Sequence, residues 1–571
     1  MSGAYLRNEG YQPVDGNVFE SFKKMNDIFS PNDGRRYYRE LENTCYDSDA
    51  PYDFEKQTHM RLTKSEHDIN CLGEAYFKRH VKVTIQFSGE GVTFDNQEEL
   101  SYTETGTAPN KVKTLNAIAS GKVMNTNRIF IGFKSSNQIF RQLEVETDRG
   151  DTGYLQMECV KEGFAYATYK PRSERKTKKF VHSLYNNVQK MDNSVCGCYF
   201  NPNDGKWDEK NPTQRTVEFD LIIPLNDLLA FQAFDDYPRS FGDIILKYYN
   251  TPHSMVYCQV DPARVGDILN VCYEELHNDD YALTLATKFD YTREFEQIGH
   301  PTKLITKIVK GADKLAVTSA LVNFQVVKME ITEDKFIVPG YGVIESTARA
   351  IPTLFNRRDP FMIPAQQIDV RTLNQGCVTT SGIVSDFTYA LHNVTDIVAV
   401  FPQHQSQRTV FRNPMVRNLQ VTIDGRNYPD NAMSTVGDIF FTRMLQASDL
   451  DGVNECTKEY EDSLTRERST DKKRLKPWKD QTSFICTIPV MRDGKSVFFD
   501  GLESKNNQVS IRLQANPIHS NTDADVYCTQ SPDPPQLWFT RTTYWTWCPE
   551  DGLKYHSTGT PAKYASPYDA S

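Results

Sequence analysis

HVKVTIQF, residues 80–87, is the stretch that decides the fold class, because apolar and polar side chains alternate along it without a break. Val81, Val83, Ile85 and Phe87 share one face of an extended chain, and the residues between them share the other. A period of two is typical of a strand with one buried face, whereas a helix repeats its apolar positions every three or four residues. The segment therefore predicts an antiparallel strand lying on a hydrophobic core.

The same pattern returns along most of the chain, in short segments separated by clusters of turn-forming residues. These segments are RIFIGF, FRQLEVET, TVEFDLIIPL, SFGDIILKYY, LVNFQVVKMEI, DFTYAL, DIVAVF, LQVTIDG, SFICTIPV, QVSIRLQ and LWFTRTTYWTW. Helical periodicity is confined to three stretches, residues 18–29, 265–277 and 434–450. Strands that do not alternate regularly with helices disfavour a parallel βαβ fold and favour antiparallel sandwiches.

The composition is typical of a folded protein. The net charge of the chain disfavours direct coating of nucleic acid. The 571 residues are 39% hydrophobic and 12% aromatic, which is enough to bury large cores without cross-links. The formal net charge is −10, and a protein that neutralises phosphates needs the opposite sign. An acidic surface instead suits a particle that must stay dispersed in solution.

Cysteine usage and targeting signals point to folding in a reducing compartment. The twelve cysteines are scattered and include no C-x-x-C pair, so they are expected to be buried small hydrophobes rather than a disulfide framework or a zinc site. No apolar run approaches the roughly 18 residues of a membrane span. The segment MSGAYLRNEGYQ has no signal-peptide organisation, so synthesis in the cytoplasm is expected.

Two pairs of segments suggest that the chain contains an internal duplication. FDLIIPL, which ends near Pro224, matches FICTIPV, which ends near Pro489, and each is followed at a similar distance by a second strand, DIILKYY or QVSIRLQ. Upstream, residues 133–150 resemble residues 401–425 in having a polar turn, a Phe-Arg step and an alternating strand. Two matches in the same order favour a repeat, with its boundary between residues 341 and 350.

The last strong strand, LWFTRTTYWTW, carries aromatic residues on both faces. Alternation places Trp538 and Tyr544 on one face and Phe539, Trp545 and Trp547 on the other. A strand with one wet face would not usually carry so many, so the second face should be covered by a helix, by the other half of the chain or by a neighbouring subunit.

Motifs of catalysis, metal binding and cofactor binding are absent from the sequence. The patterns G-x-x-x-x-G-K-[ST], H-E-x-x-H and G-x-S-x-G do not occur. No catalytic, cofactor-binding or metal-binding residue is therefore predicted, although a carboxylate pair assembled from distant strands would leave no trace in the sequence. Two basic stretches, residues 170–180 and 466–479, are expected to be loops, either simply solvated or in contact with a partner.

Five or six short stretches resemble the double jelly-roll major capsid proteins of polinton-like viruses, virophages and relatives of adenoviruses. They include DFTYALHNVTDIVAVF and RNPMVRNLQVTIDGRNYP in the second half, and FDLIIPLNDLL followed by GDIILKYY and LVNFQVVKMEI in the first. The resemblance implies an all-β chain of two tandem antiparallel jelly-roll sandwiches with short inserted helices. The expected division is an N-terminal arm at 1–70, sandwiches at 71–345 and 346–548, and an extended tail at 549–571. Residues 258–313 match no part of the family pattern.

The same resemblance implies a structural function in a virion. Three chains would form a pseudo-hexameric capsomer in the icosahedral shell of a double-stranded DNA virus. Its partners would be further copies of itself, penton and minor capsid proteins, and an internal membrane or the genome through the basic loops, with no cofactor and no small-molecule substrate. The alternatives are an enzyme that acts on glycans through two jelly rolls, which is usually secreted, and a minor capsid or spike protein, which typically has one.

Overall fold

The computed structural model contains many β-strands, and its described helices are 3-10 turns of three or four residues. The described residues are 37–47, 52–63, 67–88, 102–105, 112–115, 123–124, 128–147, 152–157, 182–184, 195–200, 214–231, 234, 236–260, 295–310, 315–343, 361–374, 382–402, 404–411, 414, 416–434, 484, 486–490, 501–504, 507–517, 534–548 and 552–557. The three stretches of helical periodicity, apart from Ser434, lie outside them.

The second half of the chain forms a two-sheet sandwich of eight strands in jelly-roll order. One sheet has the order β20-β27-β22-β25, and the other has the order β21-β26-β23-β24. In chain order these are strands 1-8-3-6 and 2-7-4-5, the arrangement that two interlocked Greek keys produce. The strands are β20 (Phe361–Thr372), β21 (Ile383–Ala390), β22 (Val394–Val400), β23 (Val416–Ile423), β24 (Arg426–Met433), β25 (Cys486–Pro489), β26 (Gln508–Pro517) and β27 (Gln536–Cys548).

The first half repeats this order with larger sheets. In one sheet β1 pairs with β19, β19 with β5 and β5 with β13, and the facing sheet runs β3-β15-β10-β11. Taken in chain order these strands are again 1-8-3-6 and 2-7-4-5. They are β1 (Tyr37–Asp47), β3 (Thr58–Arg61), β5 (Tyr76–Ser88), β10 (Phe140–Thr147), β11 (Thr152–Met157), β13 (Gln214–Pro224), β15 (Ile244–Asn250) and β19 (Leu315–Val343).

Further strands enlarge the first sandwich. A four-stranded sheet, β12-β9-β16-β17, lies beside the core and contributes Phe130 and Tyr257 to it. The strands that have not yet been given are β2 (Tyr52–Asp53), β4 (Ile69–Cys71), β6 (Tyr102–Thr105), β7 (Val112–Leu115), β8 (Val123–Met124), β9 (Arg128–Gly132), β12 (Gly197–Phe200), β14 (Asp236–Pro238), β16 (Val256–Val260), β17 (Glu296–Gln297) and β18 (Thr302–Lys310). Parts of the unplaced region 258–313 are therefore built into sheets, through β16, β17 and β18.

The strand order confirms the internal duplication. Pro224 ends β13 and Pro489 ends β25, and each of these is the sixth strand of its sandwich. The segments that follow them, β15 and β26, are both seventh strands, and β10 and β23 are both fourth strands. A proline at the end of a strand has no ladder hydrogen bond to donate, which explains why it recurs at this position.

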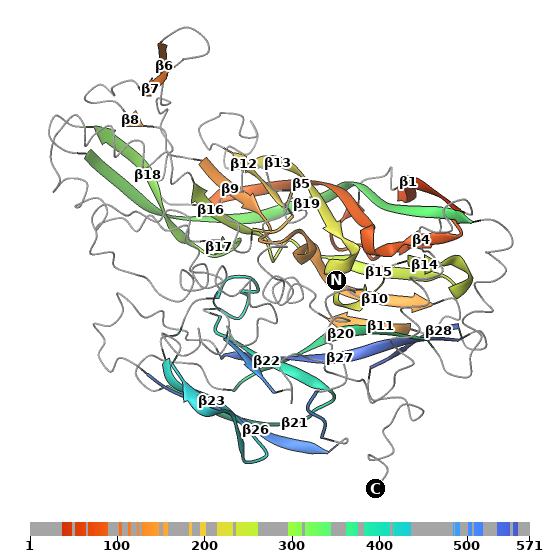
Figure 1. The fold of residues 1–571 in the computed structure, drawn as a ribbon. Coiled ribbons are helices and arrows are strands. Elements are labelled where there is room, and N and C mark those ends of the chain that lie inside the picture. Colours follow the sequence, from red (N-terminus) through yellow and green to blue (C-terminus); the bar gives the residue numbers. More distant parts are fainter. Residues whose placement is uncertain are drawn as a thin grey trace.

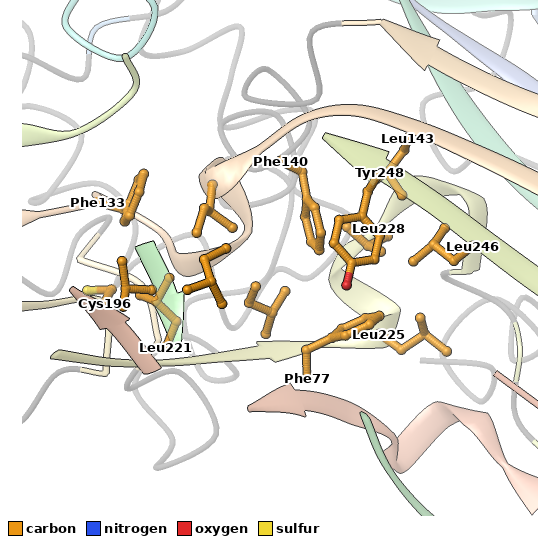
Figure 2. Close-up of a cluster of buried hydrophobic side chains, with 14 of the residues drawn as sticks. Phe77, Phe133, Phe140, Leu143, Cys196, Leu221, Leu225, Leu228, Leu246 and Tyr248 are labelled. Atoms are coloured by element: carbon orange, nitrogen blue, oxygen red, sulfur yellow. The ribbon is translucent and has the colours of Figure 1, made fainter. Parts of the chain in front are cut away.

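Alternation along the strands builds the core of the first sandwich. Val81, Val83 and Ile85 of β5 are fully buried, and Phe219 and Leu221 of β13 pack beside them. Figure 2 shows Phe77 directed toward Phe140 and Tyr248 from the facing sheet, with ring centroids 5.9 and 6.5 Å away. Burial of aliphatic and aromatic side chains on this scale is the main force that holds the two sheets together.

A buried ion pair lies on the core face of two neighbouring strands, and a residue of the facing sheet joins it. Arg79 of β5 donates from Nε to Asp334 Oδ1 of β19 at 2.9 Å, and both side chains are fully buried. Tyr248 donates its hydroxyl to the same carboxylate at 2.6 Å, and the guanidinium lies over the rings of Phe140 and Tyr248. A buried pair is tolerated only when hydrogen bonds of this kind satisfy both ions, so the cluster fixes how the two sheets are aligned.

The expected N-terminal arm at 1–70 is wrong from Tyr37 onward. Strand β1 pairs with β19, β3 pairs with β15, and β4 pairs with β14 and β19. Thr58, Met60 and Leu62 are buried in alternation, a strand signal too short to stand out in a polar stretch. Residues 1–36, which include the helical segment 18–29, lie outside the described residues.

The expected tail at 549–571 also begins with a strand. β28 (Gly552–His556) pairs with β27, and Leu553 is buried in the first hydrophobic core. Leu553 and Tyr555 point to the same face, which is a weak period-two signal in a segment otherwise rich in turn-forming residues. Strands β1 and β28 therefore extend the sheets into the ranges expected for the arm and for the tail.

Candidate functional site: the contact between the two sandwiches

The two sandwiches lie against each other, so that four sheet layers follow one another through the molecule. Figure 1 shows β5 and β19 on the outside, then β10, β11 and β15, then β20, β22 and β27, and finally β21, β23 and β26. The sheet that contains β27 is therefore buried on both faces. The sequence predicts no catalytic residue, so the candidate functional site of this chain is the contact between the two sandwiches.

Two tryptophans of β27 anchor the contact. Trp545 donates its indole N–H to the backbone oxygen of Ala230, and Trp547 donates to that of Phe241, each at 3.0 Å. Both acceptors end or lie in 3-10 turns of the first sandwich, Leu229–Phe231 and Arg239–Phe241. The ring of Trp547 also stacks on Phe241 with centroids 4.0 Å apart. Each indole therefore buries a large apolar surface and satisfies its one polar atom.

A second apolar cluster lies further along the same strand. Trp538 packs with Leu229 of the first sandwich and with Ile368, Val398 and Phe411 of the second. The other half of the chain is thus what covers the second face of LWFTRTTYWTW. Both Trp538 and Trp545 reach the first sandwich, although alternation placed them on opposite faces. The reason is that β27 extends past its own core, which contains Leu537 and Phe539 but none of its later residues.

Hydrogen bonds from β11 of the first sandwich cap the outer edge of β20. The Gln156 side chain donates from Nε2 to the backbone oxygen of Ile368 at 2.9 Å and accepts its N–H on Oε1 at 3.1 Å. Gln367 donates to the backbone oxygen of Leu155 at 2.7 Å, and the Tyr154 hydroxyl donates to that of Gln366 at 3.2 Å. An edge strand with unpaired backbone groups invites aggregation, and this seam removes that hazard.

A third set of contacts holds the loop between β22 and β23 against β17. Gln297 donates from Nε2 to the backbone oxygen of Ser406 at 2.7 Å and accepts the N–H of Arg408 on Oε1 at 2.5 Å. Gln407 donates to the Glu296 carboxylate at 3.0 Å. We call residues 296–300 and 404–409 together the polar clasp. Gln297 bonds to backbone groups, so it fixes the loop without requiring a particular side chain opposite it, whereas Gln407 depends on the Glu296 carboxylate.

Burial changes the acidity of one carboxyl group beside this contact. Asp396 of β22 lies on the same side of its strand as Val398 and Val400, which pack toward the first sandwich. Burial raises the pKa of Asp396 to about 7, and a hydrogen bond from Thr395 offsets only part of that effect. The group is therefore close to half-protonated at neutral pH, which makes the contact sensitive to pH.

The sequence singled out two basic stretches as candidate contacts with a partner. The basic stretches 170–180 and 466–479 lie outside the described residues. Among the residues that the structure describes, no group of histidine, cysteine and acidic side chains could hold a metal ion. No helix in the described part of the chain is long and apolar enough to cross a membrane.

The cysteines with described side chains are all free thiols: Cys71, Cys196, Cys198, Cys258 and Cys486. Four of them are buried, as expected for cysteines used as small hydrophobes. Burial raises the pKa of the Cys198 thiol to about 12, so this group is not a reactive thiolate at neutral pH.

Sequence reasoning missed most of the residues that form the contact. Only the tryptophans of β27 were visible, through their number and their positions on both faces. Tyr154 and Gln156 of β11 give an apolar-polar pattern too short to interpret, and the residues at 404–409 look like an ordinary polar turn. Glutamine side chains that bond to backbone groups leave no motif, because the partner can be any residue.

Several solved viral structures are similar to this chain over most of its length. The cryo-EM structure of the Sputnik virophage is 8% identical, with a TM-score of 0.44 over 93% of this chain and 92% of the other. The mavirus major capsid protein is 10% identical, with a TM-score of 0.42 over the same shares. The PBCV-1 virus capsid is 8% identical, with a TM-score of 0.43 over 92% and 97%. No family model and no curated protein matches the sequence.

Proposed function

We propose that this chain is the major capsid protein of a tailless icosahedral double-stranded DNA virus. One observation carries the proposal: two sandwiches of the same jelly-roll order lie side by side in one chain and are joined by a buried, hydrogen-bonded contact. The order agrees with the fold implied by the sequence resemblance. A subunit that packs in a capsid lattice needs a defined outline and a fixed angle between its two sandwiches, and a buried contact of this kind supplies both.

Three such chains would make a capsomer with six sandwiches and a nearly hexagonal outline. Closed three-fold symmetry repeats one interface three times, so modest contacts add up to a stable trimer. Loops at the two ends of the sandwiches are free to differ without disturbing the cores. They would contact neighbouring capsomers, penton and minor capsid proteins on the virion, and the basic stretches would meet an internal membrane or the genome.

An enzyme that acts on glycans is the competing function for two joined jelly rolls. The sheet that could have lined a cleft between the sandwiches is instead filled by Trp538, Trp545 and Trp547, each at most 3% exposed. A minor capsid or spike protein would typically have a single jelly roll, and this chain has two. Both observations favour a structural, non-enzymatic role.

Electron microscopy of the purified chain tests the proposal. Flat, six-cornered particles with three-fold symmetry are the expected result, together with no turnover on a panel of glycopeptides and oligosaccharides. Dispersed monomers that hydrolyse any of these substrates would contradict the capsid function and favour the enzyme.

A further inference from the structure

A serine hydroxyl bridges two histidine rings in the polar clasp. His300 Nε2 lies 2.8 Å from Ser406 Oγ, and His404 Nδ1 lies 2.7 Å from the same oxygen. The two rings are tilted by 59° relative to each other, with centroids 4.8 Å apart. His300 belongs to the first sandwich and His404 to the loop of the second, so the bridge joins the two halves of the chain.

The hydrogen bonds of this bridge require a neutral His404. Ser406 donates its backbone N–H to His404 Nδ1 at 3.2 Å, so that nitrogen is an acceptor and carries no proton. With one hydroxyl proton available, the chain of donors runs from His300 Nε2–H to Ser406 Oγ and from Ser406 Oγ–H to His404 Nδ1. A proton added at Nδ1 would point at the Ser406 N–H, break that bond and force the Ser406 hydroxyl to turn its own proton away.

The surroundings of His300 oppose a positive charge on its ring. Burial and the neighbouring His404 lower the pKa of His300. Burial, Arg408 and Arg141 lower the pKa of His253, whose backbone oxygen accepts the second hydrogen bond of Gln297. The one facing acid in the clasp is Glu296, and its carboxylate already accepts from Gln407 and from the Gln297 N–H.

We propose that the bridge between His300, Ser406 and His404 is an acid-sensitive latch that releases the 404–409 loop from the first sandwich. Below the ordinary histidine pKa of about 6.5, the open latch binds at His300 a proton that the closed latch disfavours. The closed state therefore loses stability as pH falls, and it is fully favoured above that value. The latch is a property of the single chain, whatever the chain assembles into.

Hydrogen–deuterium exchange of the full chain tests the latch, with rates corrected for the intrinsic effect of pH. Protection of the amides at 406–408 should fall about tenfold between about pH 7.5 and pH 5.5 as the loop opens. In the double variant His300→Gln and His404→Asn the fall should disappear. Glutamine keeps a donor for Ser406 Oγ, and asparagine keeps an acceptor for the Ser406 N–H.

The exposed His59 of β3 provides the matched control, because His59→Gln removes a titratable ring without touching the clasp. This variant should keep the tenfold fall. If the double variant does not fold, His300→Gln alone should still abolish most of the fall, because it removes the ring whose pKa the closed latch lowers. An equal loss of protection in the histidine-free clasp, or none in the parent chain, would overturn the proposal.

Discussion

At the scale of single residues, the contact between the sandwiches depends on polar side chains whose partners are backbone groups. Gln156 satisfies both the N–H and the oxygen of Ile368, and the two indoles of Trp545 and Trp547 satisfy backbone oxygens across the contact. Leaving a buried backbone group unsatisfied costs roughly 1–3 kcal/mol. The specificity of the contact thus comes from a few carboxamide and indole groups set in an apolar surface.

The variant Gln156→Met tests how much the hydrogen bonds between β11 and β20, here called the seam, contribute to stability. Methionine fills a similar volume but leaves the N–H and oxygen of Ile368 without partners, so the free energy of unfolding should fall by about 2–4 kcal/mol. Chemical denaturation monitored by tryptophan fluorescence measures the change. Gln514→Met is the control, because Gln514 bonds at its side chain to Gln420 on the outer sheet; a loss as large as that of Gln156→Met would show that the seam has no special role.

The carboxyl of Asp396 should make the stability of the chain depend on pH. Its pKa in the fold, about 7, is above its ordinary value of 3.8, so the folded chain binds the proton more tightly than the unfolded chain. Stability is therefore highest at low pH with respect to this group, and it falls as pH rises from about 4 to about 7. The size of this effect is at most about 4 kcal/mol.

Asp396→Asn should stabilise the chain above about pH 7 and remove this part of the pH dependence, as measured by thermal unfolding across the range. Asp386→Asn, which changes an exposed carboxyl of β21, should leave the profile unchanged. The sign is opposite to that of the histidine latch, so the two effects are separable. A profile that is identical in Asp396→Asn and the parent chain would show that the carboxyl is not titrating in this window.

At the scale of elements, the long strand β19 shows what the sequence pattern can and cannot reveal. Its ladder with β5 shifts register between Val326 and Lys328 and again between Ile331 and Glu333. The buried positions change parity at each shift: Val322 and Phe324, then Met329 and Ile331, then Phe336 and Val338. Each extra residue turns the following side chains to the other face, so a strict period of two recognises only pieces of the strand.

For the rest of the fold, features that depend on local sequence could be predicted, and features that depend on distant partners could not. Long alternating segments such as β5 and β13, and the paired Pro224 and Pro489, were predictable because burial on one face and loss of a donor act locally. The contact residues were not predictable, because their partners are distant in sequence. Short strands such as β3 and β28 depend on long neighbours for their pairing, and four or five residues give too little periodicity to recognise.

Truncations at the start of the chain test the role of β1. Removing residues 1–30 leaves β1 intact, so the sandwiches and the proposed trimer should persist while assembly into shells is impaired. Removing residues 1–50 uncovers the edge of β19 between Lys335 and Val343. This second truncation should lower the melting temperature and promote aggregation, as followed by calorimetry and light scattering. Equal behaviour of the two truncated chains would contradict the assignment of β1 to the first sheet.

At the scale of the whole molecule, the described residues form two sandwiches of one strand order that lie against each other as successive layers. In the part of the chain that the structure describes, the first sandwich has several strands beyond the eight of the jelly roll, whereas the second adds only β28. The sheet β20-β27-β22-β25 of the second sandwich contributes one face to the core of that sandwich and the other face to the contact with the first sandwich. Duplication followed by burial of one sheet explains both the repeated strand order and the excess of aromatic residues in β27.

Sedimentation velocity of the full chain at micromolar concentration tests the central claim most directly. A capsid tile of six sandwiches requires three chains, so the protein should sediment as a species of three times the chain mass of 65.4 kDa, or as larger assemblies built from it. Almost no monomer should remain on dilution. A stable, well-folded monomer across the whole concentration range would contradict the capsid function.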